Sequence, residues 1–171
     1  MKKFCKKHID LILALTKILV LVIVLFVSFG MILGISTATN EYMNPGVKYH
    51  DNVIYARMAY SLVLRDVVVY TYTNPETNEK EEHIGRIVGM PGDTISTLSN
   101  GNYFQNNNLI YETNIQYTTN RSMEVEITLK ENEYFILNDD RSQNFDSRTY
   151  GAINEDDIKG KVIAVFRRYG I

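Results

Sequence analysis

Cysteine is nearly absent from this chain, because Cys5 is the single one among 171 residues. A lone cysteine excludes any disulfide framework within the chain, and Cys5 is either a free thiol or an acylation site close to a membrane. Low-complexity tracts are absent too, and the 45% hydrophobic and 22% charged residues are typical of folded protein. The length therefore allows one modest domain beside any membrane segment.

Acidic side chains outnumber basic ones beyond the N-terminal part. Five of the 18 lysine and arginine residues and one of the 20 acidic residues precede residue 41, which leaves 13 basic against 19 acidic side chains and a formal charge of −6. A nucleic-acid partner calls for a basic face, so we expect none. Metal ligands are also few, since His50 and His83 lack a cysteine or clear carboxylate partner, and we predict neither a metal nor a cofactor.

One long hydrophobic run stands near the N-terminus. Residues 18–40 carry no charged side chain, and a helix needs about 20 apolar residues to cross about 30 Å of hydrocarbon. We predict a transmembrane helix over 18–39; a cleavable secretory signal is the alternative, although its apolar core is usually only about 7–15 residues long. Lysines precede the run, at positions 2, 3, 6, 7 and 17. The positive-inside rule thus makes 1–17 a cytoplasmic basic segment and 40–171 an extracellular domain in the cell membrane.

Helical periodicity is lacking after this run, whereas short strand-like segments recur. Residues 123–129 alternate apolar and polar side chains, which is typical of a strand with one wet face. Asp66–Thr73 and Glu82–Gly89 predict a hairpin, because Asn74–Asn78 interrupts them with turn residues. Further strands are expected at 53–56, 62–64, 94–98, 103–104, 109–111, 134–137 and 160–166. Many short strands indicate an all-β, antiparallel, barrel-like domain.

Four motifs follow one another in a characteristic order. They read YMNPGVKYHDNV at 42–53, RDVVVY at 65–70, GRIVGMPGD at 85–93 and NDDRSQNFDSRTYG at 138–151. The chain resembles the type I signal peptidases, whose corresponding segments read S-M-x-P, G-D-I-V-V-F, K-R-V-I-G-x-P-G-D and G-D-N-R-x-x-S-x-D-S-R-x-x-G. The resemblance covers most of the chain after the first helix, and it implies the coiled, antiparallel signal-peptidase fold.

The departures from the family pattern coincide with its catalytic positions. The resemblance places Tyr42 where the family has its nucleophilic serine and Gly85 where it has its general-base lysine. Asn144 replaces the serine that supports the lysine, and Asn40 replaces a serine that contributes to the oxyanion hole. A serine nucleophile needs a nearby base, and glycine cannot act as one. We therefore predict a pseudoenzyme without catalytic residues.

Other side chains could in principle supply the missing groups. Lys48 and His50 follow Tyr42, and His83 lies two residues before Gly85, so on a strand it shares that face. Each is more readily interpreted as a surface or hydrogen-bonded residue. The serines outside the nucleophile segment, Ser61, Ser96, Ser122 and Ser142, are more readily interpreted as ordinary turn or strand residues.

Peptide-binding geometry can survive the loss of the dyad, because main-chain hydrogen bonds along an extended substrate supply affinity. The residues expected to contact a peptide or partner are Tyr42, Met43, His83, Gly85 and Arg86. The alternative is that Tyr42 fills the groove as a core plug. Charge-assisted hydrogen bonds are expected to brace the site through a loop containing Asp139, Arg141, Asp146, Ser147 and Arg148.

The resemblance is closest to signal-peptidase-like proteins of Gram-positive pilus-assembly loci, which lack the dyad. It implies a membrane-anchored chaperone or adaptor that contacts membrane lipid, pilin precursors or their signal-peptide regions, and a pilus sortase. Two alternatives remain open. One is an active signal peptidase with an unusual nucleophile, and the other is a regulator of a true signal peptidase.

Overall fold

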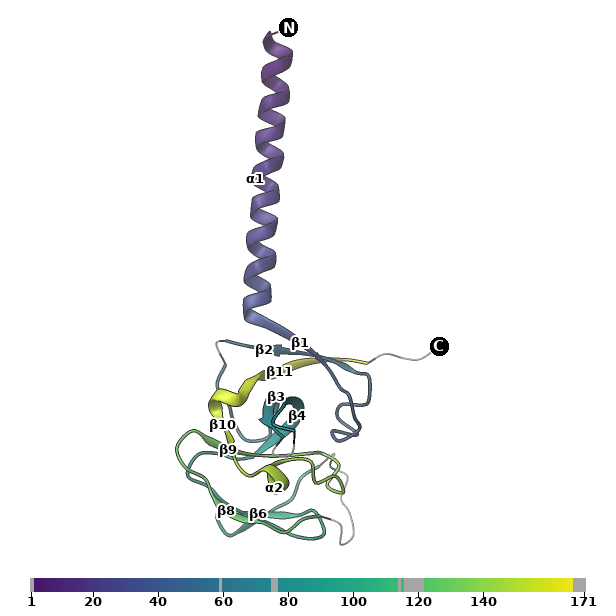
Figure 1. Cartoon of the computed structure of the whole chain (residues 1–171), viewed down its shortest axis with the longest axis vertical. Coiled ribbons are helices and arrows are strands. Elements are labelled where there is room, and N and C mark those ends of the chain that lie inside the picture. Colours follow the sequence, from purple (N-terminus) through teal and green to yellow (C-terminus); the bar gives the residue numbers. More distant parts are fainter. Residues whose placement is uncertain (1, 59, 75–76, 114, 116–121, 168–171) are drawn as a thin grey trace.

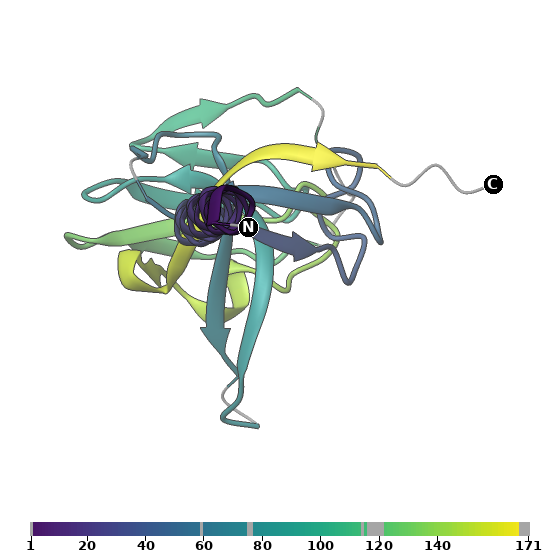
Figure 2. The same ribbon diagram turned by 90° about the horizontal axis from the view of Figure 1, so that it is seen from above.

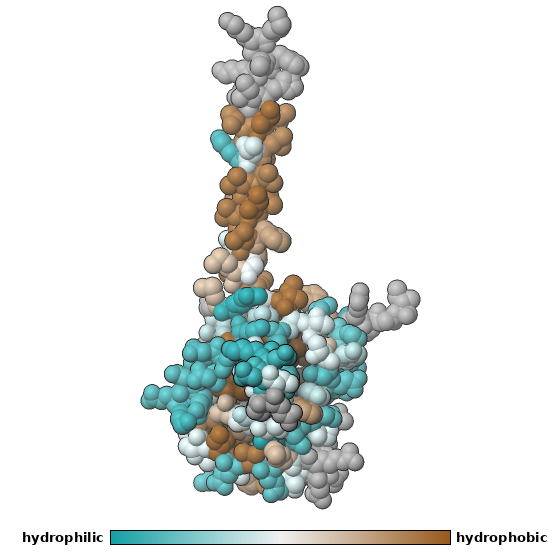
Figure 3. All heavy atoms as spheres, in the orientation of Figure 1, coloured by the Kyte–Doolittle hydropathy of each residue, from teal (hydrophilic) through white to brown (hydrophobic). Residues whose placement is uncertain are grey.

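A computed structural model describes residues 2–58, 60–74, 77–113, 115 and 122–167 of the chain. Its first element, α1 (Lys2–Ile32), is a helix that stands out from a β domain (Figure 1). Leu11–Ile32 is apolar and long enough to cross a membrane, and its side chains are exposed along the helix (Figure 3). Membrane anchors and signal sequences share these properties, so the helix is one or the other.

The helix ends earlier than the expected residue 39. Leu33–Thr37 forms strand β1, which pairs antiparallel with β2 (Asn52–Ala56). Gly34 helps to explain the change, because a Cβ atom at this position would lie 2.2 Å from Cζ of Tyr55 on β2. Glycine, which has no Cβ atom, allows the Tyr55 ring to lie this close to the backbone. Apolar residues at 33 and 35 thus belong to the sheet rather than to the helix.

Two antiparallel sheets make up the domain. The larger has the order β1, β2, β11 (Ile158–Phe166), β3 (Val67–Thr73), β4 (Lys80–Gly89), β9 (Glu133–Leu137) and β10 (Ile153–Asn154). The smaller has the order β7 (Asn108–Ile110), β6 (Tyr103–Gln105), β5 (Thr94–Thr97) and β8 (Glu126–Thr128). Across the described residues the sheets coil without closing into a barrel, which agrees with the predicted all-β, loosely barrel-like class.

The expected strand at 62–64 is absent from the structure, where 62–63 has no regular structure and a turn follows at 64–65. The carboxylate of Asp66 accepts a hydrogen bond from the amide of Val63 at 2.9 Å, and Arg65 takes a positive φ of 73°. A side chain that binds a nearby backbone amide competes with strand pairing. The expected hairpin is confirmed as β3 and β4, which extend beyond the rest of the domain (Figure 2).

Short helical turns complete the domain. Helix α2 (Ser147–Tyr150) follows the charged loop, and the 3₁₀ turn η1 (Glu155–Asp157) leads into β11. Neither has a length that sequence periodicity could have revealed. The domain core consists of three buried clusters, of which the central one lies between β3, β4 and β9 and includes Tyr70, Ile87 and Ile136.

The close packing of β11 against β2 gives a first prediction. A Cβ atom on Gly160 would lie 2.0 Å from the carbonyl oxygen of Ala56, whereas one on Gly30 in α1 would meet nothing within 4 Å. We expect Gly160→Ala to lower the free energy of unfolding by at least about 1–3 kcal/mol, as overpacking does. Gly30→Ala should leave domain stability unchanged. Thermal melts of the full chain in detergent measure both, and equal melting temperatures would contradict the packing described here.

Candidate functional site

A buried ion pair lies at the centre of the charged loop. Asp146 and Arg148 are both buried, and the carboxylate of Asp146 accepts hydrogen bonds from Nε and Nη2 of Arg148 at 2.8 and 2.5 Å. Asp146 also caps α2 by accepting the amide of Arg148 at 3.1 Å, and it accepts the amide of Asn138 at 2.9 Å. One carboxylate thus joins the end of β9 to the start of α2.

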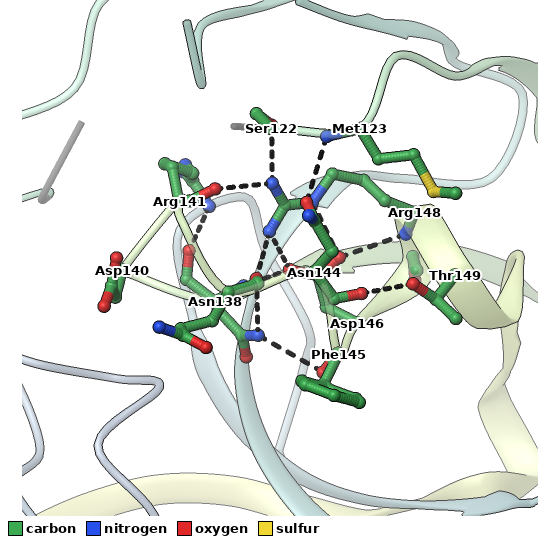
Figure 4. Close-up of polar contacts among 12 residues, drawn as sticks. Ser122, Met123, Asn138, Asp140, Arg141, Asn144, Phe145, Asp146, Arg148 and Thr149 are labelled. Carbon is green, nitrogen blue, oxygen red and sulfur yellow. Dashed lines mark hydrogen bonds and ion pairs between the residues drawn. The ribbon is translucent and has the colours of Figure 1, made fainter. Parts of the chain in front are cut away.

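The guanidinium of Arg148 connects this pair to the rest of the loop. Its Nη1 donates to Oγ of Ser122 at 2.5 Å and to the carbonyl oxygen of Arg141 at 2.8 Å, while Nη2 also donates to the carbonyl oxygen of Gln143 at 2.5 Å (Figure 4). Charge-assisted hydrogen bonds of this kind are stronger than neutral ones. They hold an irregular backbone in a single shape.

Two further ion pairs flank the loop. Arg141 pairs with Glu112, and its Nη1 donates to the carbonyl oxygen of Asn138 at 2.5 Å. Asp139 accepts two hydrogen bonds from Arg86, at 2.7 Å from Nε and 2.6 Å from Nη2. Arg86 also donates to the carbonyl oxygen of Arg65 at 2.8 Å. Arg86 thus holds the loop, and its expected role as a partner contact stays a prediction.

The loop also fixes the segment that contains Tyr42. The amide of Asp140 donates to the carbonyl oxygen of Tyr42 at 2.9 Å, and Oδ1 of Asn40 accepts the amide of Tyr42 at 3.1 Å. The Tyr42 ring stacks on Phe145 with centroids 5.4 Å apart and planes 9° apart. Tyr42 is half-buried and belongs to none of the three buried clusters, which favours a groove residue over a core plug.

Met43 points the other way, into the core. It is 3% exposed and packs in the cluster that contains Val53 and Tyr55. Adjacent residues of this segment thus have opposite environments, with Tyr42 at the surface and Met43 inside. The expectation that Met43 contacts a partner is corrected, because the core covers its side chain.

A groove with a cavity volume of about 860 Å³ lies beside Tyr42. It runs between the segment after β1, the end of the β3–β4 hairpin and α2, and the residues that line it are Thr39, Asn40, Tyr42, Tyr72, Thr73, Asn74, Glu81, Glu82, His83, Phe145, Thr149 and Tyr150. The sequence analysis named Asn40, Tyr42 and His83 among these. It missed the carboxylates and most of the aromatic side chains, although the alternation of Tyr70 and Tyr72 along β3 was a usable signal.

His83 forms part of the floor of the groove. Its side chain is 10% exposed, and its ring lies 5.9 Å from that of Tyr70 and 5.7 Å from that of Tyr72. Burial lowers the pKa of His83, against the opposing effect of Glu81, whose carboxylate lies 3.5 Å from Nε2. The ordinary pKa of histidine is about 6.5, and a lower pKa leaves the imidazole of His83 neutral near pH 7.

Gly85 lies two residues after His83 on β4 and therefore shares its face of the strand, as predicted. Gly85 is buried. A Cβ atom on Gly85 would lie 2.4 Å from Cγ2 of Ile136 and 3.1 Å from Cε1 of Tyr70. The Tyr70 hydroxyl is itself buried without a hydrogen-bond partner in the described part of the chain, and burial raises its pKa well above the usual value. The packed side chains of Ile136 and Tyr70 therefore cover position 85. The expected peptide contact at Gly85 is corrected.

The remaining candidates lie away from the groove. Oδ1 of Asn144 accepts the amide of Met123 at 3.0 Å (Figure 4). Lys48 and His50 lie on an exposed loop, and His50 stacks against Tyr49. The hydroxyl of Ser122 accepts a hydrogen bond from Arg148 and does not reach the groove as a nucleophile. The hydroxyl of Ser142 donates to Asp140 at 2.6 Å. Ser61 and Ser96 are likewise outside the lining.

A further polar cluster, which the sequence did not predict, contains Ser36, Glu82 and Lys159. The hydroxyl of Ser36 donates to Glu82, and Nζ of Lys159 donates to the other carboxylate oxygen of Glu82 at 2.5 Å. The amine of Lys159 is thus held by the carboxylate of Glu82. The cluster joins β1, β4 and β11 near the end of α1. Among the described residues that line the groove, His83 is the one neutral base.

Comparisons with known proteins agree with this frame. A family model described as signal peptidase, peptidase S26, matches residues 9–167. Signal peptidase IB of Staphylococcus aureus strain Mu50 is 26% identical over 160 residues, which are 82% of this chain and 81% of that protein. Signal peptidase I P of Bacillus subtilis subsp. natto is 32% identical over 99 residues, which are 52% of this chain. The match spans about half, 53%, of the Bacillus protein.

A solved structure also resembles the chain. The crystal structure of a signal peptidase I from Enterococcus faecalis V583 aligns with a TM-score of 0.49 and 20% sequence identity. The alignment covers 63% of this chain and 100% of that chain.

The packing around Gly85 gives a second prediction. We expect Gly85→Ala to lower the free energy of unfolding by about 1–3 kcal/mol because the new methyl group overlaps Ile136. In an Ile136→Ala background, where that overlap is removed, the same substitution should cost clearly less. Denaturant unfolding of the four variants forms a double-mutant cycle. Additive effects would show that position 85 has free space, and with it room for a longer side chain.

Proposed function

Since the chain belongs to the signal peptidase family, peptidase S26, we propose that it is a membrane-anchored member that binds exported proteins without cleaving them. The observation that carries the proposal is the packing at Gly85. Glycine offers no base at this position, and Ile136 and Tyr70 crowd the space that even a Cβ atom would need. A hydroxyl nucleophile requires a base within about 2.6–3.2 Å.

The groove supports a binding role. It lies beside Tyr42, and the stacked Phe145, the β3–β4 hairpin and α2 enclose it. The braced loop keeps these walls in place through the Asp146–Arg148 pair. An extended peptide can gain affinity from main-chain hydrogen bonds and selectivity from side-chain contacts in such a groove. Neither contribution depends on a catalytic serine.

The partners that we propose are pilin precursors or their signal-peptide regions, with a pilus sortase as a further contact. This assignment rests on the motif resemblance, namely Tyr42 and Gly85 within otherwise well-kept segments. In the proposed topology, the lysines before the apolar run stay in the cytoplasm and the β domain faces outward, close to membrane lipid. The protein would then act as a chaperone or adaptor for sortase-dependent polymerisation.

A retention experiment tests the proposal directly. The full chain, immobilised in detergent, should retain a pilin precursor with its signal peptide more strongly than the same pilin without that region. We expect Tyr42→Ala to weaken retention while leaving the melting temperature near the wild-type value, because Tyr42 is only half-buried. Tyr49→Ala, on an exposed loop outside the groove, is the matched control and should retain the precursor normally.

Two results would count against this function. Equal retention by a well-folded Tyr42→Ala variant would remove Tyr42 from the interface. Unchanged pilus polymers on the cell wall after deletion of the protein would remove the assembly role. Co-purification of an active signal peptidase, in place of pilin and sortase, would instead favour a regulator of that enzyme.

A further inference from the structure

Aromatic rings and a carboxylate converge on one wall of the groove. In the register of β3 and β4, Tyr72 lies opposite Glu81 and Tyr70 lies opposite His83, so these side chains share a face of the hairpin. Tyr150 of α2 stacks on Tyr72 with centroids 3.5 Å apart and planes 14° apart. This wall thus combines ring surfaces with an acidic group at its outer end.

A second aromatic pair lines the groove. Tyr42 and Phe145 lie in nearly parallel stacking there, and both line the groove. The face of an aromatic ring carries negative electrostatic potential and attracts ammonium or guanidinium groups. A groove lined by two aromatic pairs and a carboxylate is therefore suited to a cation.

The charge of Glu81 is not neutralised within the groove. A hydrogen bond from Nδ2 of Asn74 at 2.9 Å lowers the pKa of Glu81, so the carboxylate is ionised at neutral pH. In the part of the chain that the structure describes, the ion-pair partner of Glu81 is His83, and burial lowers the pKa of that imidazole. The residues of the lining, all described, include no lysine or arginine.

Nearby lysines are engaged elsewhere. Lys80 lies 3.6 Å from a carboxylate oxygen of Asp157, and Lys159 binds Glu82. Glu82 also lines the groove, but it is on the opposite face of β4 from Glu81, as alternation along a strand requires, and Lys159 pairs with it there. The groove is left with an acidic, aromatic wall that lacks a positive group of its own.

We propose that the groove recognises a basic side chain of an extended peptide segment, with Glu81 binding the charged end and Tyr72 and Tyr150 contacting its alkyl stem. The inference rests on the proposed function and specifies the chemistry of the partner. The cavity volume of about 860 Å³ lies in the range of about 300–1,000 Å³ that is usual for ligand sites. It can hold one long side chain together with flanking backbone.

A pair of probe peptides isolates the positive charge. Both are short, capped, alternating valine–threonine peptides; one carries a central lysine and the other carries norleucine, which has the same alkyl chain without the ammonium group. The peptides are titrated calorimetrically into the full chain in an uncharged detergent at about pH 7.5. This pH lies above the ordinary histidine pKa of about 6.5, so the imidazoles stay neutral. We expect the lysine peptide to bind about tenfold more tightly.

Variants locate the effect. Glu81→Gln keeps an acceptor for Asn74 but removes the charge, so it should abolish the preference for lysine while leaving the affinity for norleucine unchanged. Glu79→Gln is the matched control, because Glu79 lies on the same hairpin outside the lining, and it should keep the preference. A lysine preference that persists in a folded Glu81→Gln variant would overturn the assignment.

The outcomes also separate this inference from the proposed function. Equal binding of the two peptides, with pilin precursor still retained, would overturn the charge recognition and leave the binding role standing. Failure to bind the peptides and the precursor alike would overturn both.

Discussion

The buried pair of Asp146 and Arg148 is the interaction on which the rest of the site depends. Its carboxylate holds the start of α2 and the end of β9, and its guanidinium holds Ser122 and two loop carbonyl groups. Removing one partner of such a pair leaves an uncompensated buried charge, which typically costs about 3–5 kcal/mol. The pair is well satisfied because further hydrogen bonds occupy its remaining donors and acceptors. It thereby fixes a loop that no regular secondary structure supports.

This rigid loop determines the shape of the groove at two points. The amide of Asp140 binds the carbonyl oxygen of Tyr42, and the loop presents Phe145 to the Tyr42 ring. Helix α2, which Asp146 caps, brings Tyr150 onto Tyr72 of the hairpin. The frame of the family is thus present, while aromatic and apolar side chains occupy its centre. Ile136 and Tyr70 pack over Gly85, and the aromatic stacks of Tyr42 and Tyr72 line the groove beside it.

Much of the fold could be predicted from the sequence. The ordered motifs indicated the family, and turn residues and alternation located the β3–β4 hairpin and most strands. The bracing loop was identifiable because its carboxylates and arginines stand close together in the chain. The end of α1 was not, since the apolar residues at 33 and 35 suit a membrane helix and a paired strand equally well. The turn at 64–65 includes a hydrogen bond from the amide of Val63 to the side chain of Asp66, which composition does not reveal.

The groove was harder to predict for a physical reason. Its walls bring together segments that are far apart in sequence, as in the stacks of Tyr72 on Tyr150 and of Tyr42 on Phe145. The roles of Met43 and Arg86 depended on side-chain direction, which motif matching does not give. The burial of Gly85 could not be predicted either, because it results from Ile136 on β9 and Tyr70 on β3, the two strands that flank β4.

The most direct test of the central claim is a cleavage assay with the full chain in detergent, at stoichiometric excess over a signal-peptide-bearing pilin precursor. Mass spectrometry follows the precursor, and a genuine signal peptidase serves as the positive control. The account predicts intact precursor with this protein and cleaved product with the control. Release of the signal peptide at the expected junction would contradict it and would show that the groove contains a working nucleophile and base.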